Sequence, residues 1–200
     1  QGHTQVVTTT VGKDGNYSVD VPNALPDGDY TATATVKDTA GNEAAATDPG
    51  SVDTVVPMVT AQDQVVVEAT GSTVTGTIKV VETDVASVTV GGKDVTVASN
   101  SNPVVIATDN GTLKVTGYNA STGVVTYSYT ENGVAKDHTA GNDSVVDHFV
   151  VVVKDTAGNT GMDTLDVKIT DTVPTAVNDS NHISEIGGSV SGNVLTNDVA

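Results

Sequence analysis

The chain has 200 residues, with 25 acidic residues against eight basic ones and a formal net charge of −17. A surface with this charge repels nucleic acid and anionic lipid, because the attraction to phosphate that dominates such binding has the wrong sign. No apolar run approaches the length of about 18 residues that marks a membrane-spanning helix. We therefore expect neither nucleic-acid binding nor membrane insertion.

The composition indicates a chain built from β-strands. Valine and threonine make up about a third of the residues, and such β-branched side chains fit a pleated surface better than a helix. Disorder is the competing interpretation of an acidic chain with few aromatic residues. The regular alternation of apolar and polar residues, and a hydrophobic content of 37%, favour folded β-sandwiches instead.

The start of the sequence and the absence of cysteine bear on the origin of the chain. No signal peptide opens the sequence, and the first residues already resemble part of a strand, so we expect a piece of a longer protein. A chain without cysteine is typical of a reducing compartment, and equally of bacterial proteins that are exported unfolded and use no disulfides.

The first predicted unit, residues 1–53, is an incomplete repeat. Alternation predicts strands at Gln5–Val11, Tyr17–Val21 and Tyr30–Lys37, separated by the turns GKDGN and LPDGD. Tyr30 resembles the tyrosine corner of immunoglobulin-like sandwiches, and an ordinary tyrosine at a strand start explains it equally well. The unit is too short for seven strands, so we expect its N-terminal part to lie outside this sequence.

The second predicted unit, residues 54–173, is a complete sandwich. Short turns such as GGKD, DNGT and NASTG separate its apolar runs, a spacing that favours a sandwich over a helix-connected parallel sheet. Nine strands are predicted: Gln64–Glu68, Thr73–Val81, Ala86–Val90, Asp94–Ala98, Val104–Ala107, Gly111–Tyr118, Val124–Glu131, Asp147–Lys154 and Met162–Thr170.

The third predicted unit, residues 174–200, is only the beginning of a repeat. The phrase HISEIGGSVSGNV at His182–Val194 is similar to VVVEATGSTVTGT at Val65–Thr77, with Glu185 matching Glu68 and Gly188 matching Gly71. Two units therefore begin with similar sequence, and two end with similar sequence. This self-similarity is typical of a tandem array.

The phrase VKDTAGN occurs twice, at Val36–Asn42 and Val153–Asn159, and an Asp-Thr-x-Pro or similar phrase follows each copy. We expect the oxygen ligands of each copy to gather at one pole of their own sandwich, with a fourth from the first loop of the next domain. Calcium prefers six to eight such oxygens. The candidate calcium ligands are Asp38, Asn42, Asp53, Asp63, Asp155, Asn159, Asp171 and Asp179.

A purely structural interpretation of the repeated phrase stays open. Asp and Asn side chains hydrogen-bond to the backbone in tight turns, and Gly or Asn adopts the positive φ that such turns require. One copy of the phrase is explained well by turn chemistry alone. Two copies, each before a domain junction in a strongly acidic chain, favour calcium.

No catalytic constellation is present in the sequence. We find no nucleophile elbow, no Cys–His pair and no phosphate-binding loop, so we predict that the chain is not an enzyme. The histidines lack the spacing of a zinc site. His138 and His148 flank TAGNDSVVD and stand near Asp143 and Asp147 in the sequence, which we interpret as surface chemistry.

The longer phrases resemble a known class of proteins. The stretch DGNYSVDVPNALPDGDYTATATVKDTAGN, with the later VDTVVP, resembles the bacterial immunoglobulin-like repeats of giant RTX-type adhesins exported by type I secretion. The stretch GTLKVTGYNASTGVVTYSYT resembles a longer repeat of the same adhesins, and AVNDSNHISEIGGSVSGNVL resembles the start of a cadherin-like repeat. The resemblance covers nearly the whole chain.

This resemblance implies an all-β chain of tandem immunoglobulin-like β-sandwich domains at a bacterial cell surface. It implies a non-enzymatic spacer, stabilised by Ca²⁺ at Asp38, Asn42, Asp53, Asp155, Asn159 and Asp171, that serves attachment or biofilm formation. We expect a monomer whose partners are neighbouring repeats, with any host, biofilm or surface ligand bound elsewhere in the protein.

Two other functions remain open at this stage. The middle domain is larger than the first unit and carries Tyr118, Tyr127 and Tyr129, which suit a module that binds a glycan or a protein. Alternatively, the chain is an accessory sandwich attached to a secreted hydrolase.

Overall fold

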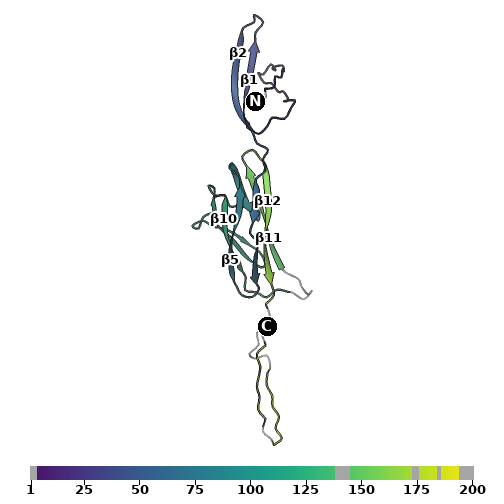
Figure 1. The fold of residues 1–200 in the computed structure, drawn as a ribbon, viewed down its shortest axis with the longest axis vertical. Helices are drawn as coiled ribbons and strands as arrows, with labels where there is room; N and C mark the ends of the chain where they lie inside the picture. The colour runs from purple at the N-terminus through teal and green to yellow at the C-terminus, as the bar shows by residue number, and fades with distance from the viewer. Residues whose placement is uncertain (1–3, 138–144, 173–175, 184–185, 194–200) are drawn as a thin grey trace. The chain divides into compact units, whose positions relative to one another are not determined.

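The computed structural model describes residues 4–137, 145–172, 176–183 and 186–193, and the chain divides into two compact units, Gln1–Val55 and Val56–Ala200 (Figure 1). Every regular element among the described residues is a β-strand. The predicted all-β fold class is therefore confirmed.

The first unit contains one antiparallel hairpin, β1 (Gly28–Lys37) and β2 (Glu43–Val52). The strand predicted at Tyr30–Lys37 is confirmed. Strand β2 was not predicted, because EAAATDPGSV contains Pro49 and Gly50 and lacks β-branched alternation. Its strand conformation follows instead from pairing with β1 across the turn between them.

The strands predicted at Gln5–Val11 and Tyr17–Val21 do not form. The two segments still lie antiparallel to each other around the turn at Gly12–Asn16, where the Gly12 N–H donates to the Asn16 carbonyl at 2.8 Å. Side chains hold them: Thr9 Oγ1 donates to the Ser18 carbonyl at 2.9 Å, and Gln5 Nε2 donates to the Asn23 carbonyl at 2.9 Å. The turn predicted at GKDGN is confirmed, and the two strands predicted on either side of it are wrong.

The second unit is a sandwich of two five-stranded sheets (Figure 1). The first sheet has the order β3 (Met58–Ala61), β5 (Thr73–Val81), β10 (Val124–Glu131), β9 (Gly111–Asn119), β8 (Val104–Ala107). The second has the order β4 (Gln64–Val67), β12 (Thr160–Thr170), β11 (Val145–Asp155), β6 (Val85–Val90), β7 (Lys93–Asp94). This order is that of an immunoglobulin-like sandwich.

Two predictions for the sandwich fail. The segment Asp94–Ala98 is a strand only at its first residue, because the Ala98 N–H turns back to the Val95 carbonyl at 3.0 Å. Strand β3 was not predicted, since a four-residue run directly after Pro57 is too short to show a period. The other eight predicted strands form, with shifts of at most two residues at their ends.

The first strand of the sandwich is divided between the sheets. β3 pairs antiparallel with β5 in one sheet, and β4 pairs parallel with β12 in the other. Two carboxylates hold the crossing: Asp163 Oδ2 accepts the Ala61 N–H at 2.8 Å, and Asp63 Oδ1 accepts the Asp166 N–H at 2.9 Å. The first and last strands of the domain are thereby joined.

The core fills the space between the two sheets with aliphatic side chains and a few rings. The inward residues of β10, β11 and β12 are almost completely buried, and the Tyr129 and Phe149 rings meet edge to face with centroids 6.2 Å apart. Each central strand buries alternate residues, as a period of two requires.

Glycines make room for tyrosine rings on neighbouring strands. A Cβ on Gly76 would collide with the Tyr127 ring, and a Cβ on Gly111 would collide with the Tyr129 ring. In the first unit the Tyr30 ring lies over Gly50, its direct partner in the ladder. Packing on glycine is thus the observed role of Tyr30.

The C-terminal segment carries no regular element in its described residues. Residues 176–183 and 186–193 contain neither helix nor strand, and all of them are exposed. The third repeat that we expect at 174–200 remains a prediction.

The tyrosine–glycine contacts predict that one methyl group added at such a glycine lowers the free energy of unfolding of the sandwich. We expect Gly76→Ala to lower the free energy of unfolding by about 1–3 kcal/mol, because the new Cβ forces the buried Tyr127 ring to move. Gly117→Ala is the matched control in β9, where a Cβ would meet only the Thr126 hydroxyl at 3.3 Å, and we expect less than about 1 kcal/mol. Urea unfolding of both variants measures the difference, and equal costs would contradict the account.

Candidate functional site

The first copy of the repeated phrase is the turn that joins β1 to β2. Asp38 Oδ1 accepts the N–H groups of Ala40 and Asn42 at 2.9 and 2.8 Å, and Asp38 Oδ2 accepts Asn42 Nδ2 at 2.7 Å. Gly41 has a φ of 94°, which an L-residue rarely adopts. The hydrogen bonds from Asn42, first from its side chain and then from its backbone, lower the pKa of Asp38.

The second copy forms the same turn between β11 and β12. Asp155 Oδ1 accepts the N–H groups of Gly158 and Asn159 at 2.6 and 2.8 Å, and Asp155 Oδ2 accepts Asn159 Nδ2 at 2.8 Å. Asp155 is buried, whereas Asp38 is exposed. Burial raises the pKa of Asp155, but the hydrogen bonds from Asn159 and Gly158 outweigh burial, so the pKa lies below its ordinary value.

The expected gathering of each ligand set at one pole is wrong. Asp155 and Asn159 stand at one end of β12, and Asp171 follows the other end, after 11 strand residues. At about 3.3 Å per residue, that strand separates them by about 35 Å. The hairpin register likewise places Asp38 and Asn42 at the tip and Asp53 beyond the opposite end of β2. One ion therefore cannot use all members of either set.

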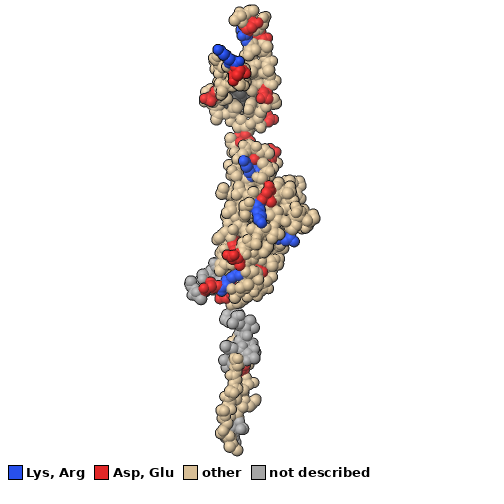
Figure 2. All heavy atoms as spheres, turned by 180° about the vertical axis from the view of Figure 1, so that it is seen from behind, with Lys and Arg blue, Asp and Glu red and all other residues tan. Residues whose placement is uncertain are grey.

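The remaining two candidates also lie apart from the turns. Asp63 binds the backbone of Asp166 midway along β12 at the strand crossing, and Asp179 is exposed in the C-terminal segment. Within the described residues, no group of three or more His, Cys, Asp or Glu side chains is arranged to hold a metal ion. Figure 2 shows carboxylates scattered over the visible face of each unit rather than gathered in one patch. Metal binding by these residues remains a prediction.

The carboxylates of the two turns fit poorly as free ion ligands. Both oxygens of Asp38 and of Asp155 already accept hydrogen bonds from N–H groups of their own turn. Those bonds supply the turn with its geometry, which is the purely structural role considered from the sequence. Asp53 and Asp171 lie outside the two DTAGN turns, and Asp53 Oδ1 accepts the Val55 N–H at 2.9 Å.

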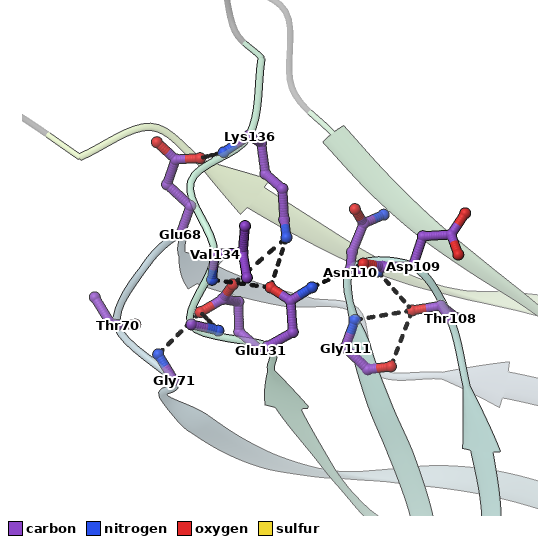
Figure 3. Close-up of polar contacts among 12 residues, drawn as sticks. Glu68, Thr70, Gly71, Thr108, Asp109, Asn110, Gly111, Glu131, Val134 and Lys136 are labelled. Atoms are coloured by element: carbon purple, nitrogen blue, oxygen red, sulfur yellow. Dashed lines mark hydrogen bonds and ion pairs between the residues drawn. The ribbon is translucent and has the colours of Figure 1, made fainter.

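Sequence reasoning missed a buried polar cluster at the end of the sandwich where β10 ends and β11 begins (Figure 3). The Glu131 side chain is fully buried, and its Oε2 accepts the N–H groups of Gly71 and Gly133, both at 2.9 Å. Its Oε1 lies 3.8 Å from Lys136 Nζ and accepts no hydrogen bond within the described part of the chain. The Lys136 charge is the compensation that this buried carboxylate requires.

The cluster ties the segment after β10 to the end of β4. Glu68, which is also buried, accepts the backbone N–H of Lys136 (Figure 3). The Glu68 N–H donates to the Thr170 carbonyl at 3.0 Å. Lys136 Nζ also donates to Asn132 Oδ1 at 2.6 Å. Burial raises the pKa of Glu131, but the bonds from Gly71 and Gly133 and the Lys136 charge outweigh it and lower the pKa below its ordinary value.

A further buried carboxylate, Asp147, stands near the start of β11. Asp147 Oδ2 accepts the hydroxyls of Tyr129 and Thr108 at 2.6 and 2.5 Å, and Asp147 Oδ1 accepts Asn110 Nδ2 at 2.7 Å. Burial, followed by the Asp147 hydrogen bond, raises the pKa of Tyr129 above its ordinary value. The hydroxyl therefore remains a donor, and the network has a structural role.

The structure changes the interpretation of the tyrosines and histidines. Tyr127 and Tyr129 are 2% and 0% exposed and Tyr118 is half-buried, so the three rings do not form an exposed platform for a sugar. His148 Nδ1 lies 2.7 Å from Asp166 Oδ1 on the surface of the second sheet, in place of the expected approach to Asp147. His138 and Asp143 lie outside the described residues.

The comparisons with known proteins bear on the first unit. Residues 1–54 match the family model described as bacterial Ig-like domain, a family that is generally non-enzymatic and occurs in surface or extracellular proteins. No curated protein matches the chain. In the part of the chain that the structure describes, no helix has both the length and the apolar character needed to cross a membrane.

The two turns provide a matched pair of substitutions. We expect Asp155→Ala to lower the free energy of unfolding of the sandwich by about 1–3 kcal/mol, because it removes a buried carboxylate that accepts the N–H groups of Gly158 and Asn159. Asp38→Ala removes the same bonds in the other unit, and we expect no effect on the urea transition of the sandwich. Equal losses in the two variants would contradict this assignment.

The lowered pKa values predict acid sensitivity. A carboxyl whose pKa is lower in the folded than in the unfolded state adds stability above its unfolded pKa, and this stability is lost as the pH falls through the folded pKa. For Glu131 and Asp155 the loss begins below their ordinary values of 4.5 and 3.8. Urea unfolding from about pH 6 to about pH 3 measures it, and Glu131→Gln should flatten the slope. An unchanged slope would show that Glu131 does not contribute.

Proposed function

We propose that the chain is a non-enzymatic spacer segment of a bacterial surface adhesin, and that its middle domain bears mechanical load between an attached surface and the cell. The match of residues 1–54 to bacterial Ig-like domains supports a surface repeat. The observation that carries the load-bearing role is the parallel ladder between β4, the second strand of the domain, and β12, its last strand.

The chain enters and leaves the sandwich at opposite ends. Strand β3 begins at Met58 beside Val81, near the turn that follows β11, whereas β12 ends at Thr170 beside Val67. Tension along the chain therefore pulls β4 and β12 in opposite directions along their common axis. Four residue pairs, from Gln64–Val167 to Val67–Thr170, then share the load at once instead of opening one after another.

Single-molecule force spectroscopy on the whole chain, pulled from its two ends, tests this proposal. The Glu68 N–H donates to β12, so alternation also directs the Gln64 N–H to β12 and the Val65 N–H away from it. We expect Gln64→Pro to lower the unfolding force of the sandwich and Val65→Pro to leave it nearly unchanged. Gln64→Ala keeps the N–H and corrects for the lost side chain.

An unfolding force equally affected by both prolines would contradict the load-bearing ladder. The force can also be applied at the two strands of one hairpin, whose hydrogen bonds then open one after another. An unfolding force from the chain ends that is no greater than this reference force would contradict the load-bearing ladder as well. In either case the segment would still be a surface repeat, but one without a load-bearing design.

Calcium remains part of the proposal in a narrower form. We propose that Ca²⁺ binds at the ends of the repeats through Asp53 and Asp171, which follow the last strands β2 and β12. The charge of −17 supports this idea, because a cation relieves repulsion among carboxylates.

Thermal unfolding in EDTA and in calcium tests the role of the ion. We expect calcium to raise the unfolding temperature of the sandwich by several degrees, by preferential binding to the folded state. Asp171→Ala should reduce this rise, and Asp20→Ala, which removes an exposed carboxylate elsewhere, should not. A temperature that is the same in EDTA and in calcium would remove calcium from the proposal and leave the spacer function standing.

A further inference from the structure

The sandwich contains two Asn–Gly pairs, Asn110–Gly111 and Asn132–Gly133, next to each other. The Asn132 N–H donates to the Asn110 carbonyl at 3.0 Å. In such a pair the backbone nitrogen of the glycine can attack the side-chain amide carbon of the asparagine, because glycine has no Cβ to obstruct the approach. Since both pairs have the same sequence, their surroundings decide which of them reacts.

The surroundings of the Asn132 side chain stabilise negative charge on its oxygen. Asn132 Oδ1 accepts the Val134 N–H at 3.0 Å and Lys136 Nζ at 2.6 Å. Negative charge develops on this oxygen when a nucleophile adds to Cγ, and donors that already point at it lower the barrier, as in an oxyanion hole. Asn132 is also exposed, so water reaches the product of the addition.

A carboxylate lies beside the attacking nitrogen. The Gly133 N–H donates to Glu131 Oε2 at 2.9 Å, which is within the reach of a general base. Glu131 Oε1 accepts no hydrogen bond within the described part of the chain, so the carboxylate has room for a proton. The nucleophile, its base and the donors for the oxygen thus come from six consecutive residues, 131–136.

We propose that Asn132 and Gly133 form a self-modifying site, at which the Asn132 amide becomes a carboxylate without an enzyme. The Gly133 nitrogen bonds to Asn132 Cγ, and its proton passes to Glu131. The Cγ–Nδ2 bond then breaks, and ammonia leaves with that proton. Water opens the resulting succinimide ring at one of its two carbonyls, which gives aspartate or isoaspartate. The net reaction consumes one water, releases one ammonia and requires no oxidant.

The other pair has the same sequence in surroundings that oppose the reaction. Asn110 Nδ2 donates to Asp147 Oδ1 at 2.7 Å, so a buried carboxylate lies beside the amide and disfavours further negative charge there. The Gly111 N–H donates to Thr108 Oγ1 at 3.0 Å, and a hydroxyl is not a base at neutral pH. Asn110 therefore serves as an internal control.

Conversion of Asn132 changes the charges of the buried cluster. The new carboxylate lies against Lys136, which is then shared with Glu131, whose burial requires that positive charge. The carboxylate also cannot donate to the Asp109 carbonyl, which Asn132 Nδ2 reaches at 2.7 Å. We therefore expect the urea midpoint of the sandwich to fall as the converted fraction grows.

Peptide mass mapping of the whole chain, incubated at neutral pH and sampled over time, measures conversion at both asparagines in one sample. The same chain unfolded in urea gives the reference rates, because there both sites differ from each other only in flanking sequence. We expect folding to make Asn132 faster than its reference and Asn110 slower, with a ratio of at least about tenfold between the two sites.

Two substitutions test the assigned groups. Glu131→Gln still accepts the Gly133 N–H but cannot take its proton, and Lys136→Gln removes the positive charge, so each should slow Asn132 in the folded chain. Lys136→Arg keeps the charge and should keep most of the rate, and Lys154→Gln, at the other end of β11, should leave it unchanged. A urea transition confirms that each variant folds.

A folded chain that converts Asn132 no faster than the unfolded chain would overturn the proposal, because the fold would then protect the site. A rate that both Glu131→Gln and Lys136→Gln leave unchanged would overturn it as well. A urea midpoint that stays constant as Asn132 is converted would contradict the link to the buried cluster.

Discussion

The parallel pairing of β4 with β12 is the contact on which the rest of the middle domain depends. It joins the first part of the domain to its last strand, and the four residues of β3 simultaneously complete the other sheet. The crossing between them is short because Asp63 and Asp163 satisfy backbone N–H groups that the bend would otherwise leave unpaired. β3 and β4 each complete one of the two sheets, and one continuous core lies between the sheets.

The first unit shows which structure the repeated phrase specifies where the described residues form only a two-stranded sheet. The turn at Asp38–Asn42 has nearly the same hydrogen bonds as the turn at Asp155–Asn159, so five residues suffice to specify it. The alternate residues of β1 that correspond to the buried face of β11 are nevertheless exposed. Local sequence determines the turn, whereas burial depends on strands that come from elsewhere in a domain.

The same distinction explains which features could be predicted from sequence. Strands such as Thr73–Val81 and Val124–Glu131 alternate over eight or nine residues, and they form where they were predicted. Strand β2 contains Pro49 and Gly50 and lacks that signal, because only its pairing with β1 makes it a strand. The segment Val95–Ala98 has the signal but turns back on itself, as the hydrogen bond from the Ala98 N–H to the Val95 carbonyl shows.

The candidate site was predictable in chemistry but not in arrangement. The phrase DTAGN correctly indicated a tight turn held by Asp and Asn. The grouping of Asp155 with Asp171 ignored the 11-residue strand between them, whose length alone sets them at opposite ends. The partnership of Glu131 with Lys136 had no sequence signal, because the burial of a carboxylate depends on the loops that cover it.

Native-state hydrogen exchange tests most directly whether the β4–β12 ladder closes the domain. The Glu68 N–H donates to Thr170 across this ladder, while the N–H groups of Val65 and Val67 point away from β12. If the ladder is integral to the fold, the Glu68 amide exchanges as slowly as the amides of β11, and only through global unfolding. A Glu68 amide that exchanges as fast as those of Val65 and Val67 would show that β4 detaches locally, and would contradict the account.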